Sequence, residues 1–133
     1  MAETDLKKLL ARLAPRVNDG EFVFCFVSSE SELEIPEADC LGSFHELEGR
    51  TILISKPAAI RHGLKFDATF SWITLDVHSS LEAIGLTAAV SKALADQGIA
   101  CNMIAAFHHD HLFVPVAQSK QATEILKKLS EKA

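Results

Sequence analysis

Residues able to do chemistry gather in two short stretches of this chain. The first runs from Leu75 to Thr87 and leads from an apolar segment, through Ser79 and Ser80, to Gly85 and an amphipathic segment. Backbone N–H groups at the start of a helix have no intrahelical partner and carry partial positive charge. They suit a carboxylate or another small anion. We therefore expect an anion-binding loop here.

The second stretch is the polar cluster His108-His109-Asp110-His111. Imidazole and carboxylate groups together can bind zinc or a similar ion. Four adjacent residues, however, point in different directions around a hairpin, and spacings such as HExxH are absent. A polar hairpin tip is the alternative, so His109 and His111 stay a secondary metal hypothesis and we expect no cofactor. The remaining histidines have no sequence link to this cluster: His45, His62 and His78.

Several polar residues near the first stretch have a structural as well as a ligand-binding interpretation. Gly85 permits a positive φ or a close backbone approach, which suits a loop-to-helix joint or a ligand. Ser79 and Glu82 have capping-box spacing. Asn102 lies in an apolar segment and needs a partner, which a ligand or a neighbouring backbone could supply. Asp76 could accept from a ligand ammonium or remain a solvated charge.

Apolar periodicity predicts the elements that position these residues. The first half contains a helix from about Leu6 to Leu13, capped by Thr4 or Asp5, and then a strand at 21–27, a loop at 28–42, a hairpin of strands 44–47 and 51–55, and a short helix from Pro57 to about Gly63. The second half contains a strand at 70–77, a helix from about Leu86 that ends near Gly98, a strand at 99–107, a turn at 108–110, a strand at 112–116 and a final helix around 122–129.

The second half therefore has the order β-α-β-β-α, which lacks the last strand of a βαββαβ unit. The N-terminal helix and strand, within 5–27, have the order that would complete it. Strand 21–27 could pair with strand 70–77 and cover an exposed edge. The fold class that follows is α+β, an antiparallel sheet with helices on one face.

The segment 70–130 resembles the ACT domain family. The similarity lies in four runs: Ile73–Val77, Gly85–Val90, Leu94–Ile99 and Asn102–Ile104. It is greatest to the ACT domains of aspartate kinases. The whole chain resembles small stand-alone bacterial ACT-like proteins, with an ACT domain at 67–133 and a degenerate ACT-like half at 1–66.

This resemblance implies a ferredoxin-like sandwich with strand order 4-1-3-2. It also implies side-by-side pairing of ACT units, either within one chain or between the chains of a homo-oligomer. The third strand is then central, so Pro115 should end or bulge it near Val114. The resemblance also implies a non-enzymatic regulatory module that binds an amino acid between its first loop and a neighbouring unit's strand. The corresponding ligand-binding residues are Ser79, Ser80, Ala83, Ile84, Gly85, Leu86, Thr87, Asn102 and Ile104. Two alternatives remain: a metal-binding protein or enzyme that uses the histidine cluster, and a ligand-free assembly domain.

Composition excludes several other classes of protein. The chain has 133 residues, 48% of them hydrophobic, and a net charge of −5, which lacks the basic footprint of a nucleic-acid binder. No apolar run approaches a membrane span, and the N-terminus has no apolar signal region, so we expect a cytoplasmic protein. The three cysteines show no CxxC spacing and predict no disulfide framework.

Overall fold

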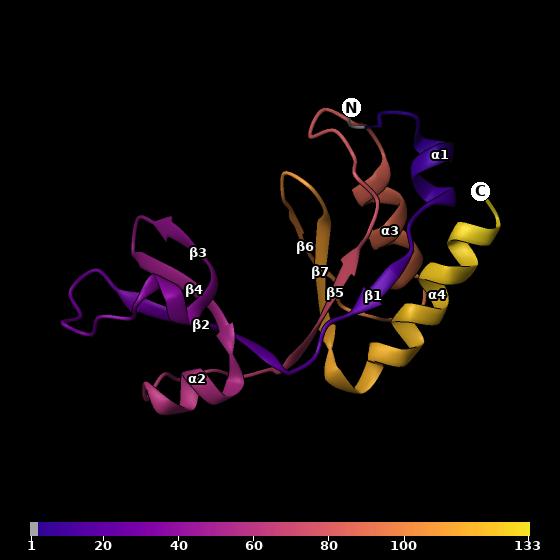
Figure 1. The fold of residues 1–133 in the computed structure, drawn as a ribbon. Coiled ribbons are helices and arrows are strands. Elements are labelled where there is room, and N and C mark those ends of the chain that lie inside the picture. Colours follow the sequence, from indigo (N-terminus) through magenta and orange to yellow (C-terminus); the bar gives the residue numbers. More distant parts are fainter. Residues whose placement is uncertain (1–2) are drawn as a thin grey trace. The chain divides into compact units, whose positions relative to one another are not determined.

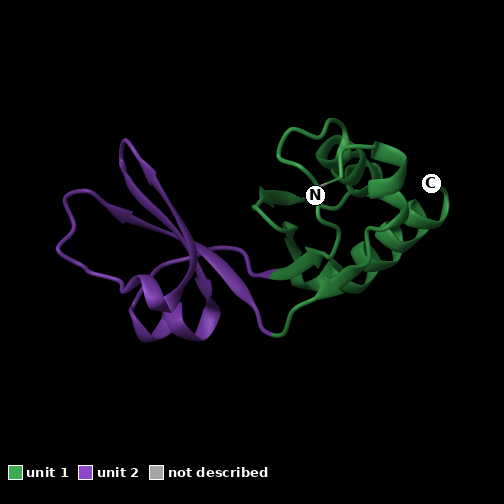
Figure 2. Cartoon of the chain, turned by 45° about the horizontal axis from the view of Figure 1, so that its top comes forward, with its two compact units in different colours: residues 1–19, 71–133 green, residues 20–70 purple. Residues whose placement is uncertain are grey.

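The computed structural model describes residues 3–133, which pack into two compact units (Figure 2). Unit 1 comprises residues 1–19 and 71–133, and unit 2 comprises residues 20–70. Unit 1 is therefore discontinuous in sequence, with unit 2 inserted into it. The predicted halves, 1–66 and 67–133, follow the sequence resemblance to ACT domains. The two units follow the packing of the chain, so their boundaries differ from those of the halves.

Unit 1 contains a four-stranded sheet with helices on one face (Figure 1). The strands lie in the order β1-β5-β7-β6. The elements are α1 (Leu6–Ala11), β1 (Pro15–Val17), β5 (Phe70–Leu75), α3 (Leu86–Ala95), β6 (Asn102–Ala105), β7 (Asp110–Pro115), the 3-10 turn η2 (Val116–Gln118) and α4 (Ser119–Glu131). With β5 counted first and β1 last, this order is the 4-1-3-2 arrangement of a ferredoxin-like sheet. The predicted fold class is thus confirmed.

Local features set the ends of two helices in unit 1: a capping side chain begins α1, and a glycine follows the end of α3. Asp5 caps α1, because its Oδ1 accepts from the Lys8 N–H at 3.2 Å. Gly98, with φ +73°, follows the end of α3, and the Ile99 N–H donates to the Leu94 carbonyl at 3.0 Å. Both features agree with the sequence predictions. β7 ends at Pro115, which also agrees, since proline cannot continue a central ladder.

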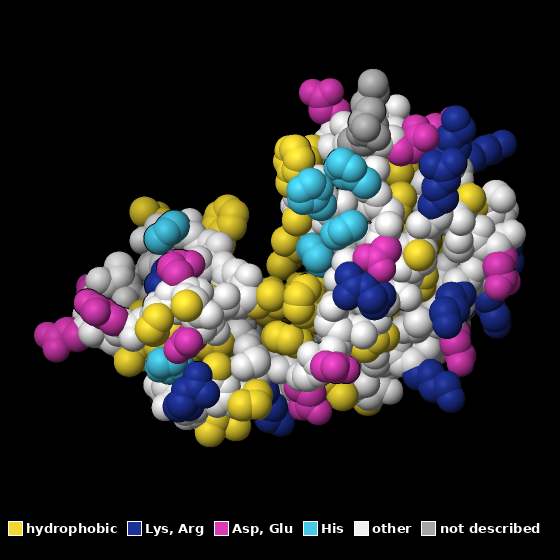
Figure 3. Space-filling view, in the orientation of Figure 1, with side chains coloured by type: hydrophobic (Ala, Val, Ile, Leu, Met, Phe, Trp, Pro, Cys, Tyr) yellow, Lys and Arg dark blue, Asp and Glu magenta, His cyan; other side chains and the backbone are white. Residues whose placement is uncertain are grey.

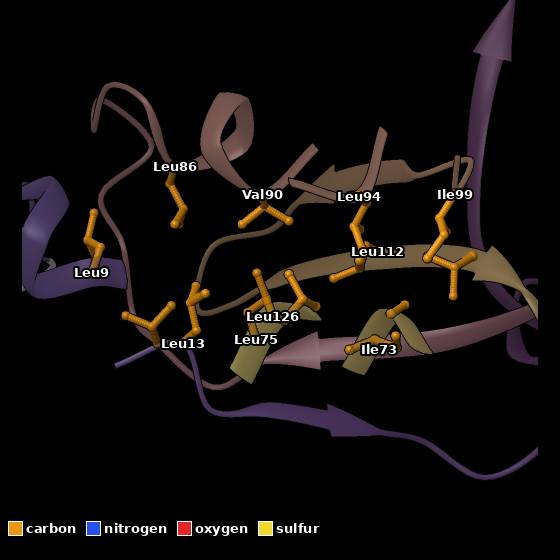
Figure 4. Close-up of a cluster of buried hydrophobic side chains, with 13 residues drawn as sticks. Leu9, Leu13, Ile73, Leu75, Leu86, Val90, Leu94, Ile99, Leu112 and Leu126 are labelled. Atoms are coloured by element: carbon orange, nitrogen blue, oxygen red, sulfur yellow. The ribbon is translucent and has the colours of Figure 1, made fainter. Parts of the chain in front are cut away.

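The apolar core of unit 1 lies between the sheet and its three helices (Figure 4). Its fully buried side chains come from α1, β5, α3, β7 and α4, and include Leu9, Ile73, Leu75, Val90, Leu94, Leu112 and Leu126. Burial of such side chains contributes about 1.5–3 kcal/mol each. The opposite face of the sheet has no helix of unit 1 over it and carries the polar residues described below (Figure 1).

Unit 2 is a smaller antiparallel sheet with one helix. Strand β4 (Gly49–Ser55) lies between β2 (Phe22–Ser28) and β3 (Cys40–Glu46), with α2 (Lys56–Arg61) and the 3-10 turn η1 (Glu37–Asp39) completing the unit. The predicted hairpin is confirmed, since β3 and β4 pair from Glu46 and Gly49 back to Cys40 and Ile54. Its core contains Val23, Cys25, Ile35, Ile52, Ile54, Ala58, Ala59 and Leu64.

The N-terminal segment completes the sheet of unit 1, as predicted, but with a different strand. Pro15–Val17 pairs with Leu75–Ile73 in antiparallel register, whereas β2 meets β5 only at Phe22 and Phe70. The prediction chose 21–27 because that run is the strongest apolar pattern in the first half. Its inward side chains are used instead in the core of unit 2, and a three-residue strand leaves little pattern to detect.

Candidate functional site

The loop between β5 and α3 is tied to the N-terminal segment of the chain. The Glu3 N–H donates to the His78 carbonyl at 3.1 Å, and the Ser80 N–H donates to the Glu3 carbonyl at 2.9 Å. At the far end of the loop, Gly85 has φ +101°, and a Cβ there would lie 2.9 Å from Leu6 Cδ2. Gly85 is therefore required both for its conformation and for the approach of Leu6.

The loop is also joined to the hairpin between β6 and β7. Ser79 Oγ donates to Asp110 Oδ2 at 2.9 Å, and Asp110 is buried. The capping box predicted for Ser79 and Glu82 does not form, because α3 begins only at Leu86, beyond both residues. Ser80 Oγ instead accepts from the Glu82 N–H at 3.1 Å, which closes a turn within the loop.

Helix α3 begins at Leu86 with Gly85 as its N-cap, and no side chain of the described residues caps it. Its first N–H groups are thus available to an anion. The other predicted loop residues divide by burial. Leu86 is buried and Ala83 packs against the same core, whereas Ile84 and Thr87 are exposed, Ile84 to 86%.

Asn102 and Ile104 lie on the polar face of the unit 1 sheet, because they pair with Phe113 and His111. Asn102 Nδ2 has a long contact of 3.5 Å to the Phe113 carbonyl. Asn102 begins β6, and that strand runs toward the hairpin that contacts the loop (Figure 1). Within one chain, Asn102 therefore lies at the opposite end of β6 from the loop.

A hydrogen-bonded group around His111 occupies the middle of this face. Trp72 Nε1 donates to His111 Nδ1 at 3.0 Å, and Thr74 Oγ1 lies 3.1 Å from the same nitrogen. Because an indole N–H can only donate, Nδ1 is unprotonated and the proton of the neutral ring is on Nε2. Burial lowers the pKa of His111. Asn18 Nδ2 completes the group by donating to Thr74 Oγ1 at 2.9 Å.

Asp76 forms an ion pair with Arg16 at the edge of this face. Arg16 Nε and Nη2 donate to the two carboxylate oxygens at 2.9 and 3.0 Å, and Arg16 Nη1 donates to Asn18. The hydrogen bond from Arg16 lowers the pKa of Asp76. The pair is exposed, so it aligns β1 with the end of β5 more than it stabilises the fold. Asp76 is thus a paired charge.

Histidine side chains gather on the surface of unit 1 (Figure 3), where His78, His108, His109 and His111 follow one another as a row of neighbouring rings. Ring centroids are 5.4 Å apart for His78 and His108, 6.4 Å for His108 and His109, and 6.4 Å for His109 and His111. Across residues 3–133, no three His, Cys, Asp or Glu side chains converge to hold a metal ion. The Nδ1 lone pair of His111 is also taken by Trp72, which leaves its Nε2 as a donor in the observed tautomer.

The cysteines are free thiols away from this surface. Cys25 is buried in unit 2, while Cys40 and Cys101 are half-buried. Burial raises the pKa of Cys101 to about 11. A thiol with a raised pKa is a poor nucleophile and metal ligand at neutral pH.

The sequence had signals for part of this arrangement. The period of a strand already placed Trp72, Thr74 and Asp76 on one face. The strand period did not reveal Arg16, because the strand that carries Arg16 to Asp76 is too short to recognise. It also did not reveal His78 as a neighbour of the hairpin, because the two are thirty positions apart in sequence. Of the helices in the described part, none is both long and apolar enough to span a membrane.

The permuted βαββαβ topology and the helix-covered sheet define unit 1 as a ferredoxin-like domain. Comparison of the whole chain with family models gives two matches. One ACT domain model matches residues 1–71, and a second matches residues 67–128. The chain belongs to the ACT domain family, with two ACT-like parts in tandem.

Solved structures agree with this assignment. A Vibrio cholerae protein of unknown function, described as a "possible transport protein", is 38% identical, with a TM-score of 0.79 over 94% of this chain and 95% of that one. An Agrobacterium tumefaciens protein is 17% identical, with a TM-score of 0.71 over 87% of both chains. The regulatory subunit of Thermus thermophilus aspartate kinase is 7% identical, with a TM-score of 0.58 over 86% of this chain and 95% of that one, and shows the fold alone. No curated protein matches the chain.

Proposed function

We propose that the protein is a non-enzymatic regulatory module that binds a small amino acid at the loop 79–87. The observation that carries this proposal is the start of α3, where Gly85 takes a positive φ and no described side chain caps the first N–H groups. These groups would bind the ligand carboxylate. Exposed Ile84 and Thr87 lie beside them for side-chain and hydroxyl contacts. Membership of a family of regulatory domains supports the same function.

We further propose that the site is completed by a second copy of the chain. Strand β6 is an edge of the unit 1 sheet, and in the described residues it pairs only with β7. Two β6 strands paired antiparallel across a two-fold axis would place Asn102 of one copy beside the Ala105 end of the other. That end adjoins the hairpin and the loop. The pairing would thus explain why Asn102 and the loop are apart within one chain.

Such a dimer links ligand binding to assembly. A ligand held by the loop of one copy and Asn102 of the other binds the dimer and not the separate chains, so it shifts the equilibrium toward the dimer. The remaining predicted residues have supporting roles in this arrangement. Ser79, Ser80 and Gly85 shape the loop, Ala83 and Leu86 anchor it to the core, and Ile104 lies on the paired strand.

A thermal-unfolding screen of the twenty amino acids in the presence of EDTA tests the proposal. A ligand at a hundred times its dissociation constant should add about 2.7 kcal/mol of stability. Asn102→Ala should abolish the shift, while Gln97→Ala, which changes an exposed amide on the other side of the unit, should retain it. Ile104→Arg should reduce both the fraction of dimer, measured by analytical ultracentrifugation, and the rise in unfolding temperature that the ligand causes. If no amino acid shifts the unfolding temperature, the ligand assignment is wrong; a monomer that still binds would reject the shared site.

A further inference from the structure

The fold brings together two histidines that the sequence keeps apart. His78 follows β5, and His108 lies at the tip of the hairpin between β6 and β7. Their ring centroids are 5.4 Å apart, with an angle of 51° between the ring planes. We propose that His78 and His108 bind a divalent transition-metal ion that prefers imidazole ligands, such as Cu²⁺, Ni²⁺ or Zn²⁺.

The backbones that carry the two rings are fixed on both sides. The His78 carbonyl accepts from the Glu3 N–H at 3.1 Å, and the hairpin is closed by the Ala106 N–H to the His109 carbonyl at 3.1 Å. Between them, Ser79 donates to the buried carboxylate of Asp110 at 2.9 Å. These contacts hold the backbones of His78 and His108 next to each other, so that the two exposed side chains can reach a common ion.

The separation of the rings suits a shared ion. A metal–nitrogen bond of about 2.0–2.1 Å, with the ring centre about 1.2 Å beyond the nitrogen, places two tetrahedral imidazole ligands about 5 Å apart between centroids. The observed centroid distance of 5.4 Å is close to this spacing, and both side chains are exposed and free to turn their nitrogens toward a common ion. Water would complete the coordination shell, because no third His, Cys, Asp or Glu of the described residues converges on the pair.

The two rings are also chemically available. Within the described part of the chain, neither His78 nor His108 makes a side-chain hydrogen bond, and each lies beside the other and beside Phe107. By contrast, His62 Nε2 is 2.8 Å from Asp39, and His111 Nδ1 accepts from Trp72. A neutral imidazole with a free nitrogen is the form that binds these metals.

A bound ion would add a second link between the loop 79–87 and the hairpin, next to the Ser79–Asp110 hydrogen bond. It would therefore restrict the same loop that we assign to ligand binding. The metal site does not depend on that assignment, because its ligands are His78 and His108 and its test contains no amino acid.

The test is a titration of the full-length protein with NiCl₂, ZnCl₂, CuSO₄ and MgCl₂, followed by thermal unfolding and, for Cu²⁺, by electron paramagnetic resonance. We expect the first three ions, but not Mg²⁺, to raise the unfolding temperature, and the Cu²⁺ spectrum to show coupling to two imidazole nitrogens. His78→Asn and His108→Asn should each weaken the apparent affinity by at least about tenfold, or 1.4 kcal/mol. His45→Asn, an exposed histidine in unit 2, is the matched control and should change nothing.

Three results would overturn the proposal. The first is unchanged metal affinity in the double variant His78→Asn/His108→Asn. The second is loss of affinity only in His109→Asn or His111→Asn, which would assign the ion to the other pair in the row. The third is an equal loss in His45→Asn, which would indicate non-specific binding. Both test histidines are exposed, so circular dichroism with EDTA should confirm that each variant folds.

Discussion

At the scale of single residues, Gly85 is required both by its backbone conformation and by the packing around it. It combines a positive φ with the close approach of Leu6, whereas Gly98 at the end of α3 has a positive φ and open space around it. Gly98→Ala should cost about 1–2 kcal/mol, the usual cost of that conformation for a residue with a Cβ. Gly85→Ala should cost at least about 1 kcal/mol more, because Leu6 must move out of a packed position.

Urea unfolding followed by tryptophan fluorescence measures both costs. Trp72 is the single tryptophan of the chain and lies in unit 1, as both glycines do. The midpoint should fall further for Gly85→Ala than for Gly98→Ala, at an unchanged slope. Equal losses of stability would show that Leu6 yields freely and that only the backbone conformation matters at Gly85.

His111 makes the stability of unit 1 depend on pH. Its folded pKa is lowered below the ordinary value of 6.5 by burial, and its Nδ1 accepts from Trp72. As the pH falls through the unfolded value, the unfolded chain binds a proton that the folded chain does not, so stability decreases. The contribution is complete above about pH 7 and is lost as the pH falls from the unfolded pKa through the lowered folded pKa.

His111→Gln should flatten this dependence, because glutamine does not titrate. The measurement is the free energy of unfolding at several pH values from neutral to about pH 5. His45→Gln, at an exposed position of unit 2, should leave the wild-type slope unchanged. A direct check is the imidazole titration by NMR, where a pKa of His111 at or above its ordinary value would contradict the argument.

Residue-level predictions from the sequence succeeded where the cause is local. Asp5 caps the helix that it precedes, and Gly98 follows the helix that it ends, because both effects act within one turn. The assignment of Ser79 to a helix cap was wrong because α3 begins only at Leu86, and the Ser79 hydroxyl donates instead to the carboxylate of Asp110, thirty-one positions away. His78 was separated from the other histidines because its neighbours come from another element.

At the scale of elements, the loop 79–87 is joined to the hairpin by a part-buried hydrogen bond from Ser79 to Asp110. Ser79→Ala removes the donor to Asp110 and leaves a buried carboxylate without it, which should cost about 1–3 kcal/mol. Ser80→Ala is a matched control one position along, since its hydroxyl serves only an exposed turn within the loop. Hydrogen exchange should become faster in the loop and in the hairpin 106–110 for Ser79→Ala only. Similar exchange in both variants would mean that the N-terminal contacts alone position the loop.

The order of elements was predictable because long amphipathic helices and paired strands carry strong periodic patterns. The strand that pairs with the outer edge of β5 could not be predicted in this way. Residues 15–17 form a strand of three residues that starts with proline, and only its register with Leu75–Ile73 reveals it. The run 22–27 has the stronger pattern and belongs to another core. Periodicity identifies which segments are strands, but pairing is decided by which apolar face each strand must cover.

At the scale of the whole molecule, unit 1 is a ferredoxin-like domain whose last strand comes from the start of the chain. Residues 71–133 alone lack β1 and also lack Leu9 and Leu13, which are fully buried in the core. Two such side chains contribute several kcal/mol, a large part of the stability of a small domain. A chain of residues 71–133 should therefore fail to fold.

A rearranged chain should fold. Residues 71–133, a flexible Gly/Ser linker and then residues 3–19 give the order β5-α3-β6-β7-α4-α1-β1, which places the completing strand after the other three in one continuous segment. The C-terminal helix already contacts α1, since Ser130 Oγ donates to the Ala11 carbonyl at 3.0 Å, so the linker need not cross the domain. We expect its NMR amide spectrum to match the unit 1 signals of the full-length protein, and its Trp72 fluorescence to report a cooperative unfolding transition. If the fragment 71–133 folds, unit 1 does not need its N-terminal strand. If the rearranged chain does not fold, the sheet order alone does not account for the stability of unit 1.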